Sequence, residues 1–110
     1  MNNQIFNIAR DFSMSPGPRF SNQGPMSGEL LRRQLVRLLK STSEKITVVL
    51  DGTRGFGSSF LDEAFGGLIR AEGFTLEEIR DRISFVSEFD PTYILEINES
   101  LESAVRKHVN

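Results

Sequence analysis

The chain contains no cysteine and no tryptophan, and its only histidine is His108. Without cysteine, disulfides, thiolate metal sites and cysteine nucleophiles are excluded. A single histidine argues against a histidine-clustered metal site and against a Ser-His-Asp triad, and we expect His108 to lie on a frayed surface. We therefore expect no metal and no other cofactor, and chemistry restricted to phosphate, hydroxyl or carboxylate groups.

The sequence also lacks a long apolar run and an excess of charge of one sign. No run approaches the ~18 apolar residues that a membrane helix needs. The 13 Lys and Arg residues nearly balance the 15 Asp and Glu residues, which argues against a general nucleic-acid binder. The first residues, Met1-Asn2-Asn3-Gln4, lack the basic-then-apolar order of a secretory signal. We expect a cytoplasmic protein that binds neither membranes nor nucleic acids.

A chain of 110 residues fits a single domain, residues 1–110, with one core. Apolar patterning predicts three strands. Residues 4–12 carry apolar side chains on both faces and predict a strand in or near the middle of a sheet, and residues 83–89 alternate. Residues 46–50 form a β-branched run that is typical of a strand buried on both faces.

Helices are predicted between and after these strands. The first helix is capped by Ser27, and the second begins at Ser58 or Ser59 and ends at Gly73. A short third helix opens with the capping box Thr75-x-x-Glu78, and the last helix begins after Asp90-Pro91. Alternating strands and helices predict an α/β domain with helices packed on a small sheet through right-handed crossovers. Gly66 and Gly67 each cost ~1 kcal/mol relative to alanine inside a helix, which predicts a close approach of that helix to the sheet.

Residues 13–28 form a loop rich in proline and glycine, with three of the four prolines. A loop of ~15 residues in a compact domain usually has a functional role or is mobile. The alternative, which the sequence supports equally, is an unstructured crossover. In the helix that follows, the leucines form a buried stripe, and we expect Arg32 and its basic neighbours to point away from it.

The segment 51–67 is the most informative one. A buried strand leads into a glycine-rich loop and then into Ser58 and Ser59 at the start of a helix. Exposed amides and the helix dipole attract anions at such a terminus, so a phosphate on either serine would be stabilised. The alternative is that Ser59 is only an N-cap, with Asp62 completing a capping box. The pattern is neither a P-loop nor a G-x-S-x-G elbow.

Two further sets of residues are candidates for binding. An anion, as in a small-molecule or nucleotide sensor, is predicted to contact Arg19, Arg54, Gly55 and Gly57. A protein partner is predicted to dock on Phe56, an exposed Phe60, Asp62 and Glu63. No general base is evident near Ser58, so we do not expect an enzyme.

Together these residues resemble a known family. A buried strand, a loop, Ser-Ser and a glycine-containing helix are similar to the STAS domain of anti-anti-sigma factors and sulfate transporters. The similarity is greatest to the STAS-like proteins of unknown function, a small bacterial family. The matching stretches are Pro16-Gly17-Pro18-Arg19, Gly24-Pro25, Ser27-Gly28-Glu29 and Gly55-Phe56-Gly57-Ser58-Ser59-Phe60-Leu61-Asp62-Glu63-Ala64-Phe65-Gly66-Gly67.

The resemblance implies a small STAS-like α/β domain with a central mixed β-sheet of about four strands. It also implies a non-catalytic regulatory module that binds a protein. Small sheets have open edges at which the first and third strands could pair with a second copy, so we expect a monomer or weak homodimer. By analogy with anti-anti-sigma factors, the partner would be a histidine-kinase-type ATPase that phosphorylates Ser58, with Ser59 as the next candidate. Two positions depart from their Asp-Ser-Ser-Gly motif, because Gly57 stands in place of the aspartate and Phe60 in place of the last glycine.

Overall fold

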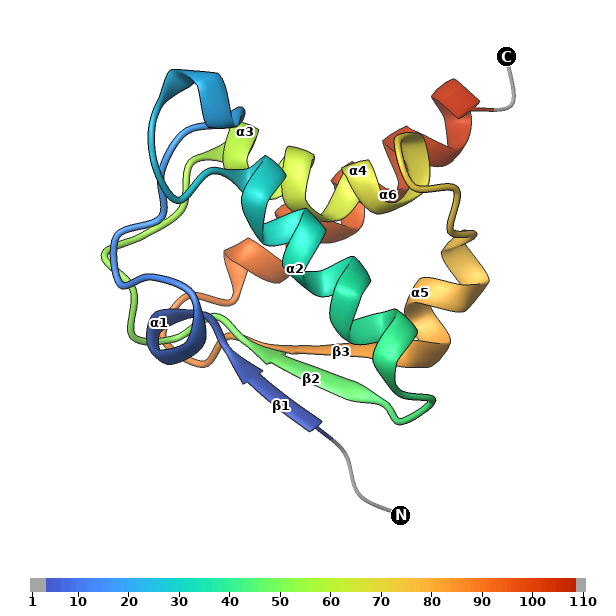
Figure 1. Ribbon diagram of the computed structural model, residues 1–110, viewed down its shortest axis with the longest axis horizontal. Coiled ribbons are helices and arrows are strands. Elements are labelled where there is room, and N and C mark those ends of the chain that lie inside the picture. The colour runs from blue at the N-terminus through green and yellow to red at the C-terminus, as the bar shows by residue number, and fades with distance from the viewer. Residues whose placement is uncertain (1–3, 109–110) are drawn as a thin grey trace.

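The computed structural model describes residues 4–108 and contains one three-stranded parallel sheet (Figure 1). Its strands are β1 (Gln4–Asn7), β2 (Ile46–Val49) and β3 (Ile83–Val86), arranged in the order β1-β2-β3. A consecutive strand order with right-handed crossovers places the connecting helices on the same side of the sheet. Figure 1 shows α2, α4 and α6 on that side.

Helical segments make up most of the remaining chain. They are α1 (Ile8–Asp11), the 3₁₀ turn η1 (Ser21–Gln23), α2 (Gly28–Ser41), α3 (Ser58–Leu61), the π-helical η2 (Asp62–Gly66), α4 (Gly67–Arg70), α5 (Leu76–Arg82) and α6 (Thr92–His108). Because α3, η2 and α4 follow one another without a break, they form a single helical segment over residues 58–70. No helix in the described part of the chain is long and apolar enough to cross a membrane.

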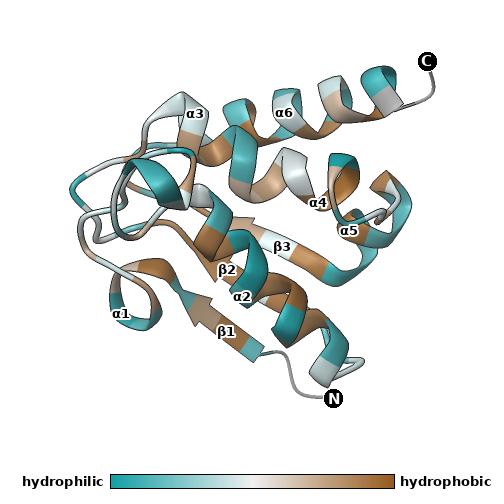
Figure 2. Cartoon of the chain, turned by 45° about the horizontal axis from the view of Figure 1, so that its top comes forward, coloured by the Kyte–Doolittle hydropathy of each residue, from teal (hydrophilic) through white to brown (hydrophobic). Residues whose placement is uncertain are grey.

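The hydrophobic core lies between the sheet and these helices. Figure 2 shows hydrophobic residues along the strands, while the helices carry alternating hydrophobic and hydrophilic bands. This banding reflects the 3.6-residue period of an amphipathic helix. The largest fully buried side chains come from α1, α2, β2 and the residue after it, residues 58–70, α5 and α6: Ile8, Leu31, Leu35, Ile46, Leu50, Phe60, Leu61, Phe65, Leu68, Ile79, Ile97 and Leu101.

The opposite face of the sheet is not covered by a described helix. Ile5, Thr47 and Ser84 share one row of the strand register. Ile5 is 61% exposed and Ser84 is also exposed. Parallel sheets are usually buried on both faces, so this open face is unusual.

Several predicted elements are confirmed in detail. The Thr75 side chain accepts a hydrogen bond from the Glu78 amide, and Glu78 accepts one from the Thr75 amide, which completes the predicted capping box. Ser27 caps α2 through the Leu30 amide at 3.0 Å. Asp90 accepts hydrogen bonds from both the amide and the hydroxyl of Thr92 at the start of α6.

The predicted sheet needs correction. The mixed sheet of about four strands is not confirmed, because the described residues contain three strands and all of them are parallel. The patterning of the sequence itself indicates only three strands, and the fourth was implied by the family resemblance.

The first strand is shorter than predicted and lies at an edge of the sheet, not in the middle. It ends at Asn7, whose side chain accepts a hydrogen bond from the Arg10 amide at 3.1 Å. The Asp11 carboxylate in turn accepts one from the Asn7 amide at 2.8 Å. These two contacts cap α1, so residues 8–11 turn into a helix where apolar alternation predicted more strand.

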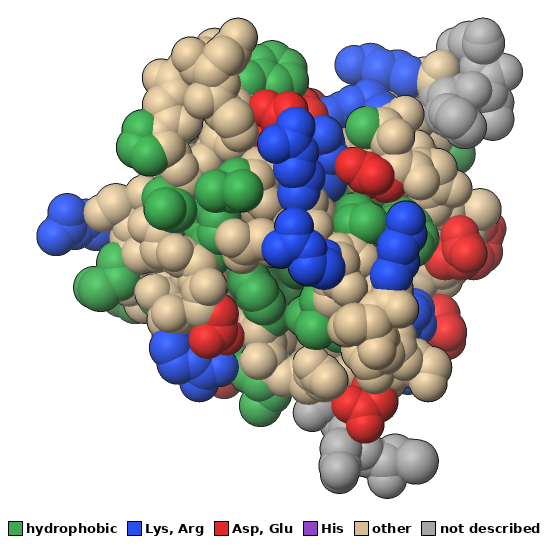
Figure 3. Space-filling view, in the orientation of Figure 1, with side chains coloured by type: hydrophobic (Ala, Val, Ile, Leu, Met, Phe, Trp, Pro, Cys, Tyr) green, Lys and Arg blue, Asp and Glu red, His purple; other side chains and the backbone are tan. Residues whose placement is uncertain are grey.

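The glycine pair in the middle of residues 58–70 approaches other helices rather than the sheet. A Cβ at Gly66 would lie 3.2 Å from the Ser100 carbonyl oxygen of α6, and one at Gly67 would lie 2.9 Å from the Arg32 Cδ of α2. Arg32 is buried against Gly67, at 8% exposure. The prediction that it points into solvent is wrong. The other basic residues of α2, Arg33, Arg37 and Lys40, are exposed as predicted, and Figure 3 shows basic side chains along the path of α2.

Candidate functional site

The candidate phosphoacceptor Ser58 lies on the surface at the first position of α3. The N-cap of this helix is Gly57, whose lack of a side chain leaves the cap without a side-chain hydrogen bond. Ser59 is therefore not the N-cap, and the alternative reading as a capping box with Asp62 is wrong. Both serines are exposed. The Ser58 hydroxyl donates a hydrogen bond of 2.7 Å to the Glu96 carboxylate of α6.

Both serines line a shallow groove of about 500 Å³ between residues 58–62 and α6. Its walls carry hydroxyl and carboxylate groups and one guanidinium: Ser58, Ser59, Ser100, Ser103, Asp62, Glu96, Glu99 and Arg19. Three carboxylates against one guanidinium give the groove a negative charge, and this charge opposes the attraction of the helix start for anions.

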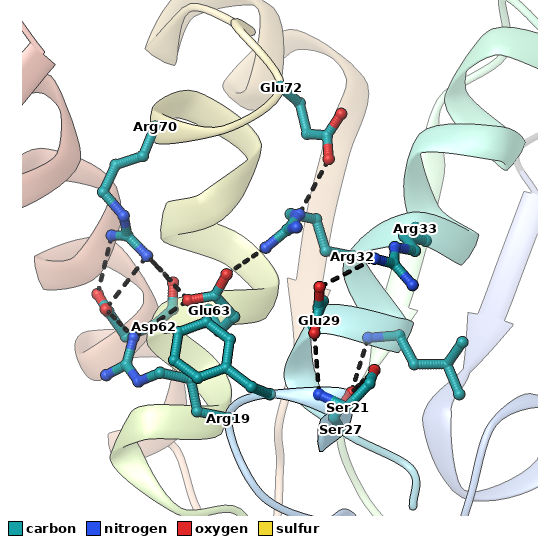
Figure 4. Close-up of polar contacts among 12 residues, drawn as sticks. Arg19, Ser21, Ser27, Glu29, Arg32, Arg33, Asp62, Glu63, Arg70 and Glu72 are labelled. Carbon is teal, nitrogen blue, oxygen red and sulfur yellow. Dashed lines mark hydrogen bonds and ion pairs between the residues drawn. The ribbon is translucent and has the colours of Figure 1, made fainter. Parts of the chain in front are cut away.

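A cluster of ion pairs borders this groove (Figure 4). Arg19 reaches from the 13–28 loop to the Asp62 carboxylate at 2.8 Å and to the Glu63 carboxylate at 3.3 Å. Arg70 of α4 contacts the same Asp62 carboxylate at 3.3 Å. The cluster fixes the 13–28 loop against η2, so the loop is not the unstructured crossover that the sequence left as an alternative.

The cluster continues inward through Glu63. Arg32 pairs with Glu63 and, at 2.9 Å, with Glu72. The Arg32 and Glu63 side chains are only 9% and 11% exposed. Burying both charges is costly unless they remain paired, so this contact ties α2 to η2.

Asp62 and Arg19 influence each other's protonation. Burial alone would raise the pKa of Asp62, but the hydrogen bond from Arg19 and the positive charge of Arg70 outweigh burial, and the pKa lies below its ordinary value. The same hydrogen bond, which the Arg19 guanidinium donates to the Asp62 carboxylate, raises the pKa of Arg19. Both groups are therefore charged at neutral pH and bound to each other.

The predicted anion-binding residues do not converge on one place. Arg19 is occupied by Asp62 and Glu63. Arg54 is exposed, donates to the Ser15 hydroxyl at 3.2 Å, and lines with Gly55 a separate pocket of about 100 Å³ at the carboxyl ends of β2 and β3. Gly57 is exposed at the start of α3, beside the negative groove.

The predicted docking residues are also differently placed. Phe60 is fully buried, so the expectation of an exposed aromatic at this position is wrong. It faces the core because it begins the helical series of apolar residues that includes Leu61, Ala64 and Phe65. Phe56 is half-buried, with its ring 5.1 Å from that of Tyr93 in an edge-to-face contact. Asp62 and Glu63 belong to the ion-pair cluster.

Glu96 is a residue of the groove to which no sequence pattern points. It is 38 residues away from its partner Ser58, and nothing in the local pattern of α6 distinguishes it from neighbouring glutamates. Among residues 4–108, no three His, Cys, Asp or Glu side chains gather as metal ligands. His108 is the last residue of α6, and the prediction for its side chain falls outside what the structure describes.

Comparison with known proteins agrees with this fold. No curated protein and no solved structure matches the chain significantly. Residues 27–92, more than half of the chain, match a protein family. This match runs from the cap of α2 through the Ser58 segment to the start of α6, and it shows that the chain belongs to the family described as the STAS-like domain of unknown function (DUF4325).

Proposed function

We propose that this protein is a non-catalytic regulatory module that binds a protein partner over α3 and α6 and is switched by phosphorylation of Ser58. The partner we propose is a histidine-kinase-type ATPase, by analogy with anti-anti-sigma factors. The observation that carries the proposal is the exposed Ser58 hydroxyl and its 2.7 Å hydrogen bond to Glu96.

A phosphate on Ser58 would change this contact in two ways. The phosphorylated oxygen has no proton left to donate to Glu96, so the hydrogen bond is lost. The phosphate also adds about −1.5 to −2 charge at neutral pH, beside a groove that already contains Glu96, Glu99 and Asp62. Like charges then repel, and the surface formed by α3 and α6 presents a different shape and charge to the partner.

The Glu96 carboxylate is also close enough to Ser58 to act as a general base, as in an enzyme with a nucleophilic serine. A nucleophilic serine needs donors that stabilise the developing oxyanion. The groove instead supplies three carboxylates, and its one guanidinium, Arg19, is bound to Asp62. A negative groove disfavours an anionic transition state, which supports binding over catalysis.

The proposal is tested by quantitative pull-down with tagged variants as bait. Ser58→Asp places a negative charge beside Glu96 and should lower recovery of the ATPase, while Ser58→Ala should recover it as wild type does. Ser43→Asp is the matched control, because Ser43 is an exposed serine in the connection between α2 and β2, at the other end of the sheet. Equal recovery with Ser58→Asp and Ser58→Ala would contradict the switch.

A further inference from the structure

A second surface lies at the free edge of the sheet, on the opposite side of α2 from the Ser58 groove. A shallow groove of about 420 Å³ runs between β1 and α2, and its walls are formed by Phe6, Gln34, Arg37, Leu38 and Ser41. Most of its lining is apolar, and Arg37 is the only charged residue in it. No strand pairs with the outer side of β1 within residues 4–108.

The hydrogen bonds of β1 show which backbone groups face outward. In a parallel ladder, alternate residues of a strand direct their amide and carbonyl groups toward the same neighbour. The Gln4 amide donates to the Lys45 carbonyl at 2.9 Å, on the β2 side, so Gln4 and Phe6 face β2. The Ile5 amide and carbonyl therefore face outward. The next outward amide, that of Asn7, is already bound by the Asp11 carboxylate.

We infer that β1 pairs antiparallel with β1 of a second copy of this chain, about a twofold axis at Ile5. A twofold interface requires a surface that is complementary to itself. Ile5 meets this requirement, because its outward amide and carbonyl can exchange two hydrogen bonds with the same groups of the other copy. The resulting sheet has six strands and buries both free β1 edges.

The side chains of β1 are suited to the same pairing. Directly opposed residues on one face of an antiparallel pair lie ~5 Å apart, which brings the two Ile5 side chains into contact on the open face. Ile5 is 61% exposed in the single chain. The residues Gln4–Asn7 themselves include no charge and no proline, the two devices that commonly block edge pairing. The Asp11 carboxylate on the outward Asn7 amide limits the exchanged hydrogen bonds within Gln4–Asn7 to the two at Ile5.

The groove beside β1 sets the extent of the interface. Four residues of strand are too few for the ~800 Å² per partner of a standard interface. The 14-residue helix α2 adds a surface ~21 Å long beside the strand, and pairing would cover Phe6 and Leu38. Arg37 is exposed and can extend into solvent at the rim. We therefore expect a weak dimer that forms with rising concentration and is independent of the Ser58 groove.

Sedimentation velocity over a range of protein concentrations tests the inference. The wild-type protein should shift from the monomer mass of 12.4 kDa to twice that value. Ile5→Asp opposes two carboxylates at the twofold axis and should raise the dissociation constant at least ~10-fold. Leu95→Asp is the matched control, because Leu95 is an equally exposed apolar residue, at 64%, on α6. It should dimerise as wild type does.

Cross-linking provides a second readout that does not depend on the stability of Ile5→Asp. Because the chain has no cysteine, a single introduced cysteine can be linked only to a second copy. With a short bismaleimide, Ile5→Cys should give a covalent dimer and Leu95→Cys should not. A wild-type protein that stays monomeric at all concentrations, or a dimer that Ile5→Asp leaves intact, would overturn the inference.

Discussion

Two neighbouring carboxylates, Asp62 and Glu63, have different surroundings and therefore different effects on stability. Glu63 is buried against Arg32, whereas Asp62 is part-exposed between Arg19 and Arg70. Neither is available to a docking partner without breaking an ion pair. Their arrangement leaves Glu96, with Glu99, as the freer carboxylates at the edge of the Ser58 groove.

Removing the charge of Glu63 should be strongly destabilising. Glu63→Gln leaves the buried Arg32 guanidinium with only Glu72 as an ionic partner, and breaking a buried pair typically costs about 3 kcal/mol. The control is Glu102→Gln, which removes the surface pair with Arg80, where both side chains are more than half exposed. It should cost less than about 1 kcal/mol. Urea denaturation of both variants measures the difference, and equal losses would contradict the assigned role of Glu63.

Asp62 should contribute a pH-dependent part of the stability. Its folded pKa lies below the unfolded value of 3.8, so the ionised form stabilises the fold above that pH. This stabilisation is lost as the pH falls through the folded pKa. We expect Asp62→Asn to be about 1 kcal/mol less stable than wild type at neutral pH, and the gap to narrow below pH 3.8. Denaturation curves across the acidic range measure this gap, and one that is constant with pH would contradict it.

For single residues, the sequence predicts which side chains lie at a helix start better than it predicts which side chains they contact. The exposed serines at the helix start were predicted correctly, because a glycine-rich loop before an apolar helical series is a local pattern. Arg32 and Glu96 were not, because their partners lie 31 and 38 residues away and come together only through tertiary packing. Phe60 was misplaced because its helical phase depends on where the helix begins.

Among the elements, the start of α2 packs tightly against the segment of residues 58–70. A Cβ added at Gly28 would lie 2.5 Å from the Phe60 carbonyl oxygen, which is backbone and cannot move without shifting the helix. Gly28 therefore sets the distance between α2 and the helix that carries Ser58. The π-helical turn η2 lies in the same segment and places Asp62 and Glu63 toward the arginines.

Gly28→Ala should separate these two elements and lower stability by about 2 kcal/mol, the typical cost of overpacking. Gly57→Ala is the matched control, because a Cβ there meets nothing within 4 Å and its φ of −76° suits any residue. Because Gly57 is the N-cap of α3, where alanine is less favourable than glycine, the control should lower stability by less than about 1 kcal/mol. Thermal unfolding of the two variants measures the effect, and a neutral Gly28→Ala would show that α2 can move away without cost.

Element types were largely predictable from the sequence, and element ends were less so. Caps such as Ser27 and Thr75-x-x-Glu78 involve neighbouring residues, so their chemistry is visible in the chain. The change from β1 to α1 depends on Asn7 and Asp11 capping a single turn, a weaker signal than the apolar alternation around it. The number of strands in the described residues follows the sequence pattern, and the additional strand that the resemblance implied is not confirmed.

For the molecule as a whole, the arrangement of charge favours a protein-binding module over a nucleotide sensor. A nucleotide sensor needs a positive site, but the groove at Ser58 is negative and Arg19 and Arg54 line different cavities. We expect nucleotides and inorganic phosphate to leave the melting temperature unchanged in a thermal-shift screen. A ligand at 100 times its dissociation constant would add about 2.7 kcal/mol, and such a shift would favour the sensor instead.

The proposed function depends most on phosphorylation of Ser58. The most direct measurement is mass spectrometry of the tagged protein isolated from its native host, together with the proteins that it brings down. We expect phosphate on Ser58 in a part of the population and a histidine-kinase-type ATPase bound to the remainder. A protein that carries no phosphate on Ser58 and recovers no such ATPase would contradict the proposal.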